Sequence, residues 1–250
     1  MSTKIMVVTH KTYPMPEDPC YLPVQAGAAI HERLPYASDA EGDSISGKNR
    51  TFCELTALYW AWKNLDADEV GLCHYRRLFR GAKGPASGKE IEDWLRDSNV
   101  ILPKPRNYYI ETNYSQYVHA HHEEDLKQTL KILKETCPDY VPSWEKVMAS
   151  TKGHRFNMFI MRKDVMDLYC EWLFPILFEL EKRLDISSYS DYDARVFGFV
   201  SERLLDVWID RQRIRYKEVP VFETEKVNWL VKGTRFVWRK IRGSLGGNRR

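Results

Sequence analysis

The chain has 250 residues, with 38 Lys or Arg against 35 Asp or Glu, 43% apolar residues and 13% aromatic residues. Eight Trp, fourteen Tyr and ten Phe exclude a disordered or collagen-like chain, because these side chains need neighbours to pack against. A mean hydropathy of −0.52, with no apolar run of about 18 residues, excludes a membrane-embedded protein and predicts a globular one.

The first third of the chain predicts two buried strands, separated by a long loop and a helix. β-Branched residues in 4–9 predict a short strand rather than a signal peptide, so we expect retention in the cytosol. Residues 13–47 contain five prolines and predict an irregular connection, of the kind that often forms a binding loop. Asn49 is placed to cap a helix over 50–64, and 69–75 (EVGLCHY) predicts a strand that is apolar up to its carboxyl end.

The remainder of the chain predicts further strands that alternate with helices. Short strands are expected at 99–103, 155–161 and 215–223, and helices at 91–97, 123–135, after Pro142, 164–184 and 194–212. This alternation predicts an α/β domain of three layers with a mostly parallel sheet.

Charge divides the chain into a body and a tail. Residues 226–250 carry eight Lys or Arg and no acid, and removing these eight charges from the net charge of +3 leaves 1–225 with −5. An acidic body argues against a nucleic-acid partner. Apolar residues recur at three- and four-residue steps from Val227 to Leu245 beside a basic stripe, which fits a helix on an anionic membrane as well as a helix docked on the body. We therefore expect a domain over 1–225 and a basic amphipathic tail over 226–250.

The common catalytic and metal motifs are missing from the sequence. No G-x-G-x-x-G, P-loop, G-x-S-x-G or H-E-x-x-H pattern occurs. Five irregularly spaced cysteines without a C-x-x-C pair predict buried thiols rather than disulfides or zinc ligands. The HAHH run at 119–122 lacks a supporting carboxylate or cysteine framework, which favours an exposed turn over a metal site.

The most informative segment is GLCHYRRLF, in which a predicted strand ends in four polar residues. Ligands of open α/β sheets bind beyond the carboxyl ends of strands, and arginine and histidine both donate to phosphate oxygens. Strand alternation would place His74 and Arg76 on one face, and Tyr75 and Arg77 on the other. The alternative is a solvated strand end with two surface arginines.

Polar residues next to the predicted helix at 50–64 are further candidates. Asp43 and Asn49 belong to GDSISGKN, where helix N-terminal amides could receive an anion or a sugar hydroxyl, although capping and a turn explain the same residues. Glu54 begins an aromatic-rich helix and needs a partner, for which His74 or one of the two neighbouring arginines is available.

Two later segments add polar residues. GHRFNMF places His154 and Asn157 at the head of a predicted strand. Arg195 and Glu202 share one face of the helix over 194–212, because they are seven residues apart. Glu202 could act as a general base or form an ion pair with Arg195 or Arg203.

Five segments together resemble a bacterial family labelled a domain of unknown function or capsular polysaccharide synthesis protein: GDSISGKNRTFCELTALYWAWKN, EVGLCHYRRLF, GHRFNMFIMRKDV, YCEWLFPILFELE and RVFGFVSERLLDVWI. The resemblance runs from about Lys4 to about Glu223. It implies a glycosyltransferase with a GT-A-like, Rossmann-related fold, and characterised relatives transfer galactofuranose from its UDP donor.

Many GT-A-like folds hold a metal with an Asp-x-Asp pair at a strand end, where this chain instead has His74 to Arg77. Asp66-Ala67-Asp68 precedes the strand and predicts a turn, and Asp191-Tyr192-Asp193 is the better carboxylate candidate if Mg²⁺ or Mn²⁺ is used. Positive side chains can neutralise a diphosphate leaving group. We therefore expect no metal cofactor, with the UDP-sugar donor as co-substrate.

The resemblance assigns roles in an inverting transfer. Glu202 would be the base, with Asp193 as its substitute, and His74 would serve the phosphate side. The other expected contacts to donor, phosphate, sugar or acceptor are Tyr75, Arg76, Arg77, His10, Lys11, Asp43, Asn49, Glu54, His154, Asn157 and Arg195.

The expected function is extension of a glycan in cell-surface polysaccharide synthesis. A basic tail suits a polyprenyl-diphosphate-linked acceptor, which would place the protein peripherally on the inner face of the bacterial plasma membrane. The alternatives are a non-catalytic glycan-binding or scaffold subunit of the same machinery and, last, a glycosidase.

Overall fold

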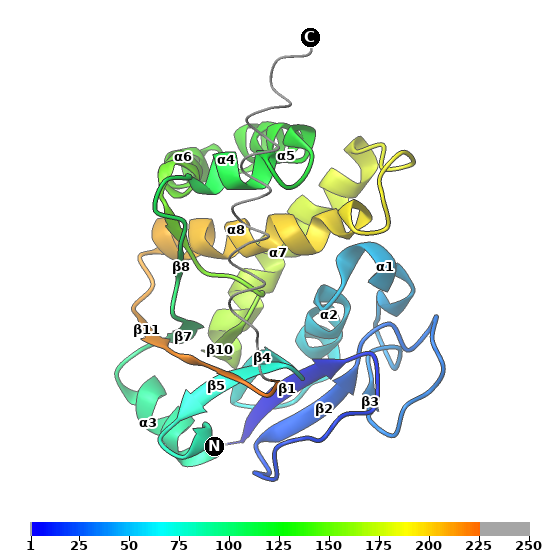
Figure 1. Cartoon of the computed structure of the whole chain (residues 1–250), viewed down its shortest axis with the longest axis vertical. Coiled ribbons are helices and arrows are strands. Elements are labelled where there is room, and N and C mark those ends of the chain that lie inside the picture. The colour runs from blue at the N-terminus through cyan, green and yellow to red at the C-terminus, as the bar shows by residue number, and fades with distance from the viewer. Residues whose placement is uncertain (1, 226–250) are drawn as a thin grey trace.

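The computed structural model describes residues 2–225, in which a mostly parallel sheet is covered by helices (Figure 1). β1 (Thr3–Thr9) pairs in parallel with β2 (Tyr21–Gln25) and β4 (Glu69–His74), whereas β10 (Phe159–Arg162) is antiparallel to both β4 and β7. The order is β11-β7-β10-β4-β1-β2-β3, and β5 pairs with β4, β6 and β12. The other strands are β3 (Ala37–Ser38), β5 (Arg77–Gly81), β6 (Gly84–Pro85), β7 (Val100–Pro103), β8 (Arg106–Asn107), β9 (Lys152–Gly153), β11 (Tyr216–Val219) and β12 (Val221–Glu223). The predicted α/β class with a mostly parallel sheet is confirmed.

Both faces of the sheet are buried, because side chains alternate along each strand. Met6 and Val8 pack into the large core under the helices, and Ile5 and Val7 pack into a smaller core on the face that α3 covers (Figure 1). The α-helices are α1 (Asn49–Phe52), α2 (Leu55–Asn64), α3 (Gly88–Arg96), α4 (Asn113–Val118), α5 (Glu123–Thr136), α6 (Val141–Ala149), α7 (Lys163–Arg183) and α8 (Val196–Gln212). Short 3-10 helices lie at Ser46–Lys48, Pro138–Tyr140 and Asp193–Arg195.

The prediction that 13–47 is irregular was wrong, because this segment contains β2 and β3. β2 extends the parallel sheet next to β1, with Val24 opposite Val8. Pro23 lies inside β2, and prolines usually argue against a strand. It is tolerated because the two-residue β3 pairs only with Val24 and Gln25, so no neighbour on that side needs an N–H from Pro23.

Two predicted elements are interrupted by residues with positive φ. The helix expected over 50–64 is broken at Cys53, whose φ is 53° and ψ −130°, and Asn49 is the first residue of α1 rather than its cap. The strand expected at 155–161 begins only at Phe159, because Phe156 and Asn157 have φ values of 76° and 51°. An L-residue in this region is strained, so both interruptions need support from the surrounding structure.

The tail over 226–250, with its predicted amphipathic helix, lies outside the described residues. Between residues 2 and 225, no helix combines the length and the apolar character that crossing a membrane requires.

Candidate functional site

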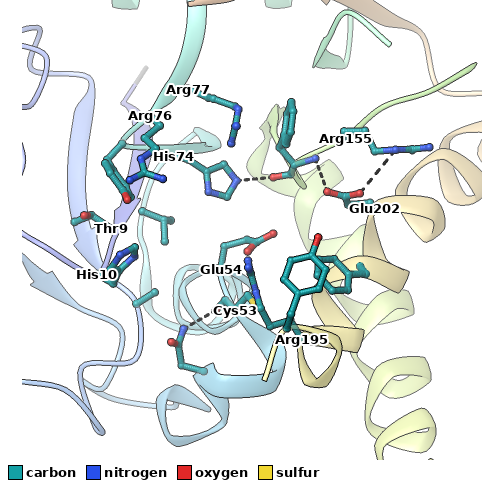
Figure 2. A pocket seen from close by; sticks show the side chains of 18 of the residues that line it. Thr9, His10, Cys53, Glu54, His74, Arg76, Arg77, Arg155, Arg195 and Glu202 are labelled. Atoms are coloured by element: carbon teal, nitrogen blue, oxygen red, sulfur yellow. Dashed lines mark hydrogen bonds and ion pairs between the residues drawn. The ribbon is translucent and has the colours of Figure 1, made fainter. Parts of the chain in front are cut away.

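A cavity of about 1130 Å³ lies at the carboxyl ends of β1 and β4 and is closed on its other side by α8 (Figure 2). Its wall contains eight Lys or Arg, three Glu and no Asp: Lys11, Arg50, Arg76, Arg77, Arg106, Arg155, Arg195, Arg203, Glu32, Glu54 and Glu202. Residues 1–225 have a net negative charge, but the residues that line the cavity have a net positive charge. This distribution favours an anionic ligand.

The turn between β4 and β5 brings His74, Tyr75, Arg76 and Arg77 to one cavity. β4 ends at His74, which pairs antiparallel with Arg77 at the start of β5, and all four residues line the wall. The expectation that alternation would separate them onto two faces was wrong, because the chain reverses direction at Tyr75 and Arg76. Residues opposite each other across an antiparallel pair lie on the same face, so His74 and Arg77 lie together.

Phe156 connects His74 to Glu202 through its backbone (Figure 2). His74 Nε2 donates to the Phe156 carbonyl at 2.6 Å, and the Phe156 N–H donates to Glu202 Oε1 at 2.8 Å. Glu202 Oε2 accepts from Arg203 at 2.9 Å and is 3.9 Å from Arg155 Nε. Both oxygens of Glu202 are therefore occupied, and the residue supports the positive-φ segment that orients His74.

Glu54 lines the cavity and keeps one carboxylate oxygen free of hydrogen bonds within the described residues. Its Oε1 accepts a 2.6 Å hydrogen bond from Asn157 Nδ2, and its Oε2 has no hydrogen-bond partner among residues 2–225. Asn157 is almost fully buried and also contacts Gly198 and Ser201, so it supports Glu54 from behind the wall. The expected pairing of Glu54 with His74 or an arginine is not observed.

The cations around His74 differ in how freely they can meet a ligand. The Arg77 guanidinium lies 4.2 Å from the centre of the Phe156 ring, and its nearest carboxylate, Glu223, is 3.5 Å away. Arg76 forms a closer, more exposed ion pair of 3.1 Å with Glu225. Arg77 is therefore held in place by stacking, with its charge only weakly compensated.

His10 and Lys11 lie beside Tyr75 at the end of β1. The His10 ring meets the Tyr75 ring edge-on at 5.5 Å, and Lys11 Nζ lies 5.1 Å from the centre of the same ring. Burial, followed by the positive charge of Arg76, lowers the pKa of His10 below its usual value. His10 therefore enters the site as a neutral imidazole at neutral pH.

An aromatic wall closes the α8 side of the cavity. His121 stacks on Phe199 with ring centres 4.2 Å apart and on Tyr192 at 5.6 Å, and the Arg195 guanidinium lies over the same two rings. Arg195 Nε is also 3.2 Å from Cys53 Sγ. Burial, with Glu54 nearby, raises the pKa of the Cys53 thiol to about 12, so this group is neutral.

The HAHH prediction needs a correction, because His121 is not exposed. Its side chain is 7% exposed and lines the cavity, and Asp193 lies 3.2 Å from its Nδ1. Burial lowers the pKa of His121. His119 contacts Glu111, and the His122 ring stacks on a tyrosine.

Four expected site residues lie away from the cavity wall: Asn157, which supports Glu54 from behind it, and Asp43, Asp193 and His154. Asp43 is in an exposed loop, where it contacts Tyr59 and Asn64. Asp193 accepts from Ser190 as well as contacting His121, and buried His154 contacts Asp206 through both its backbone and its ring. Asn49 does line the wall, but its amide nitrogen donates to the Cys53 carbonyl at 2.7 Å. The hydrogen bonds of these residues stabilise the segments around the cavity.

The sequence reasoning missed several lining residues. Arg155 and Arg203 follow His154 and Glu202 directly and lie buried at one end of the cavity. The helical spacing that placed Arg195 and Glu202 on one face also placed Phe199 there, but Phe199 was given no site role, and Arg203 was named only as a possible ion-pair partner of Glu202. For Thr9, the available signal was its position at the carboxyl end of the first strand.

The donors at the end of β4 do not suit Mg²⁺ or Mn²⁺, which GT-A-like folds commonly hold there. Both ions prefer oxygen ligands, and this position offers an imidazole and two guanidinium groups. Asp191 pairs with Arg50 at 2.6 Å, and Asp68 accepts from the Ser2 backbone. Across the described part of the chain, no three His, Cys, Asp or Glu side chains are grouped as metal ligands.

Comparisons with known proteins identify the fold and the family. The chain is similar to the apo structure of WbbM, a bifunctional glycosyltransferase, with a TM-score of 0.83 and 28% identity over 90% of this chain. The similarity spans 46% of the WbbM chain, less than half of it, and it confirms the GT-A-like fold. No curated protein matches significantly. A family described as a domain of unknown function, DUF4422, matches residues 4–213, and the chain belongs to this family.

Proposed function

We propose that the chain is a glycosyltransferase that moves a sugar from a UDP donor, with UDP-galactofuranose as the first candidate, onto a glycan acceptor with inversion. The observation that carries this proposal is the cationic cavity at the carboxyl ends of β1 and β4. The similarity to WbbM supports it. The cavity volume of about 1130 Å³ slightly exceeds the ~300–1,000 Å³ usual for small-molecule sites, which gives room for a donor and the end of an acceptor.

The β4–β5 turn would hold the diphosphate of the donor. Breaking the bond between the anomeric carbon and the β-phosphate oxygen leaves negative charge on UDP. Arg77 and Arg76 stabilise that charge, and His74 lies beside them on the same wall. Because cations take this role, we expect transfer without a divalent metal.

Glu54 is better placed than Glu202 to act as the base. Its unpartnered oxygen lies in the cavity, whereas both oxygens of Glu202 accept hydrogen bonds. In the proposed step an acceptor hydroxyl attacks the anomeric carbon, Glu54 takes the hydroxyl proton, and UDP leaves with the electron pair of the broken bond. Glu202 is then a positioning residue that acts on His74 through Phe156.

The aromatic wall is the proposed acceptor side. Tyr192 and Phe199 line the cavity and supply aromatic surface of the kind on which sugar rings pack, and Arg195 can donate to sugar hydroxyls. A polyprenyl-diphosphate-linked glycan, taken up at the inner face of a bacterial membrane during surface polysaccharide synthesis, is the proposed acceptor class.

The test is transfer or donor hydrolysis with UDP-galactofuranose, UDP-galactose and UDP-glucose, each with and without EDTA. We expect turnover with one donor that persists in EDTA. Glu54→Gln should lower kcat by about 100-fold or more while UDP binding is retained, because general-base catalysis is worth about 10²–10⁴-fold. Glu202→Gln, the matched carboxylate change, should raise KM more than it lowers kcat. Glycan binding without turnover, unchanged by Glu54→Gln, would instead indicate a non-catalytic binding subunit.

A further inference from the structure

Two consecutive apolar side chains point into solvent directly after β8. Tyr109 is 81% exposed and Ile110 is 69% exposed, the two highest values among the large apolar residues of the described chain. The residue that follows them, Glu111, is only 7% exposed although it is charged. Along this segment the apolar side chains are therefore exposed and the charged one is buried. Single exposed apolar residues are ordinary on a protein surface, but an adjacent pair at a projecting tip is not. We call this pair the Tyr109–Ile110 tip.

The tip is held in place by its surroundings. On one side, the Tyr108 side chain is buried and its hydroxyl accepts a 2.8 Å hydrogen bond from Arg155 Nε. On the other side, Glu111 contacts His119 at 2.7 Å. Between these anchors Tyr109 has a φ of 59°, and a bulky residue in this region is strained. The fold therefore holds Tyr109 and Ile110 outward at a conformational cost, instead of burying them.

Three exposed cations lie on the strands that lead to the tip or in the residues just before them. Lys104, Arg106 and Lys152 are exposed, and Lys152 lies opposite Asn107 in the β8–β9 ribbon, two residues from Tyr109. Arg106 has its guanidinium over the Tyr108 ring and forms no ion pair with any carboxylate between residues 2 and 225. An exposed tyrosine and isoleucine flanked by unpaired cations match the chemistry of an anionic lipid surface, which offers negative headgroups over an apolar interior.

We infer that the Tyr109–Ile110 tip docks on anionic phospholipid, with both side chains at the headgroup boundary. Arg106 lines the cavity and the tip follows three residues later, so docking would bring the cavity mouth to the bilayer surface. β8 runs from β7 toward the layer of α4, α5 and α6 (Figure 1). This surface belongs to the folded body and is separate from the basic tail, and the inference concerns binding alone.

The test is co-sedimentation of the full-length chain with vesicles of phosphatidylcholine, with and without phosphatidylglycerol. Tyr109→Ser combined with Ile110→Ser should weaken binding to the anionic vesicles by about tenfold or more, since each apolar side chain loses part of its burial. Ile110→Trp should strengthen binding, because tryptophan favours the interface. Leu168→Ser is the matched control, because Leu168 is a single apolar residue on α7 that is 61% exposed. It should leave vesicle binding unchanged.

Three results would overturn the inference. The first is equal vesicle binding by the double variant and the unmodified chain, which would assign any membrane affinity to other residues. The second is an equal loss in Leu168→Ser. The third is a dimer in sedimentation velocity that the double variant abolishes while vesicle binding is unchanged, which would make the tip a contact between two copies. Circular dichroism and the Tm of each variant confirm folding, which two exposed side chains should not affect.

Discussion

Replacing Arg77 by methionine tests whether the β4–β5 turn binds a diphosphate. Methionine keeps an apolar stem of similar length and removes the guanidinium that lies over the Phe156 ring. A hydrogen bond to a charged group contributes about 1.5–3 kcal/mol, and 1.4 kcal/mol corresponds to tenfold in affinity. Because Arg77 is only 24% exposed and its nearest carboxylate is 3.5 Å away, little of that energy is already used in the free protein. Arg77→Met should therefore weaken UDP binding by about 10- to 100-fold.

Arg76→Met is the matched control for this change. Arg76 is 48% exposed and already pairs with Glu225 at 3.1 Å, so a ligand gains less from it. Exposed ion pairs contribute about 0–1 kcal/mol, which predicts a loss of about fivefold or less. Isothermal titration calorimetry with UDP measures both variants, and thermal denaturation confirms that each is folded. A Kd for Arg77→Met within twofold of the unmodified chain, or equal losses in the two variants, would refute the assignment.

Three further predictions concern the fold around the cavity. Cys53→Gly should leave the Tm unchanged or raise it slightly, because relief of about 1–3 kcal/mol of strain offsets the greater flexibility of glycine, whereas Cys53→Val should lower it. Asp39→Ala should lower the free energy of unfolding by about 3 kcal/mol or more in urea titrations, since this fully buried carboxylate accepts hydrogen bonds from Gly27, Ala28, Ser46 and Thr56. The free energy of unfolding should fall as the pH decreases below about 6.5, because burial lowers the pKa of His121 and the unfolded chain then binds more protons. His121→Gln should reduce this dependence of the free energy of unfolding on pH, and an unchanged dependence would contradict the reasoning.

The fold was predictable where apolar pattern and length agree. The strand at 4–9 and the helix expected over 164–184 correspond to β1 and α7, because burial on both faces of a strand or along one face of a helix leaves a regular pattern. β2 was missed because Pro23 suggests a break, and only the pairing with β1 and the short β3 shows that this proline is tolerated. Register of this kind is a tertiary property and has no local signal.

The sequence identified many of the residues of the site but not how they are arranged. His74 and Arg77 were identified because polar residues end an apolar strand, but their common face depends on a reversal that strand alternation cannot show. The helical face of Glu202 left a base or an ion pair open, and the family resemblance assigned it as the base. The structure pairs it with the adjacent Arg203, which was the stated alternative, and with the N–H of Phe156. Phe156 is 46 residues away in the sequence, and a partner at that distance is what single-sequence reasoning lacks.

Backbone strain provides an independent reason to place function at this cavity. Cys53, Phe156 and Asn157 have positive φ, and they meet around Glu54 and Gly198. Asn157 donates to both Glu54 and the Gly198 carbonyl, and a side chain at position 198 would lie 3.4 Å from the Cys53 Cβ. Each such residue costs on the order of 1–3 kcal/mol and persists only where surrounding contacts enforce it. A fold that gathers three of them around the Glu54 carboxylate holds that carboxylate in a fixed position, which a base that must meet an acceptor hydroxyl requires.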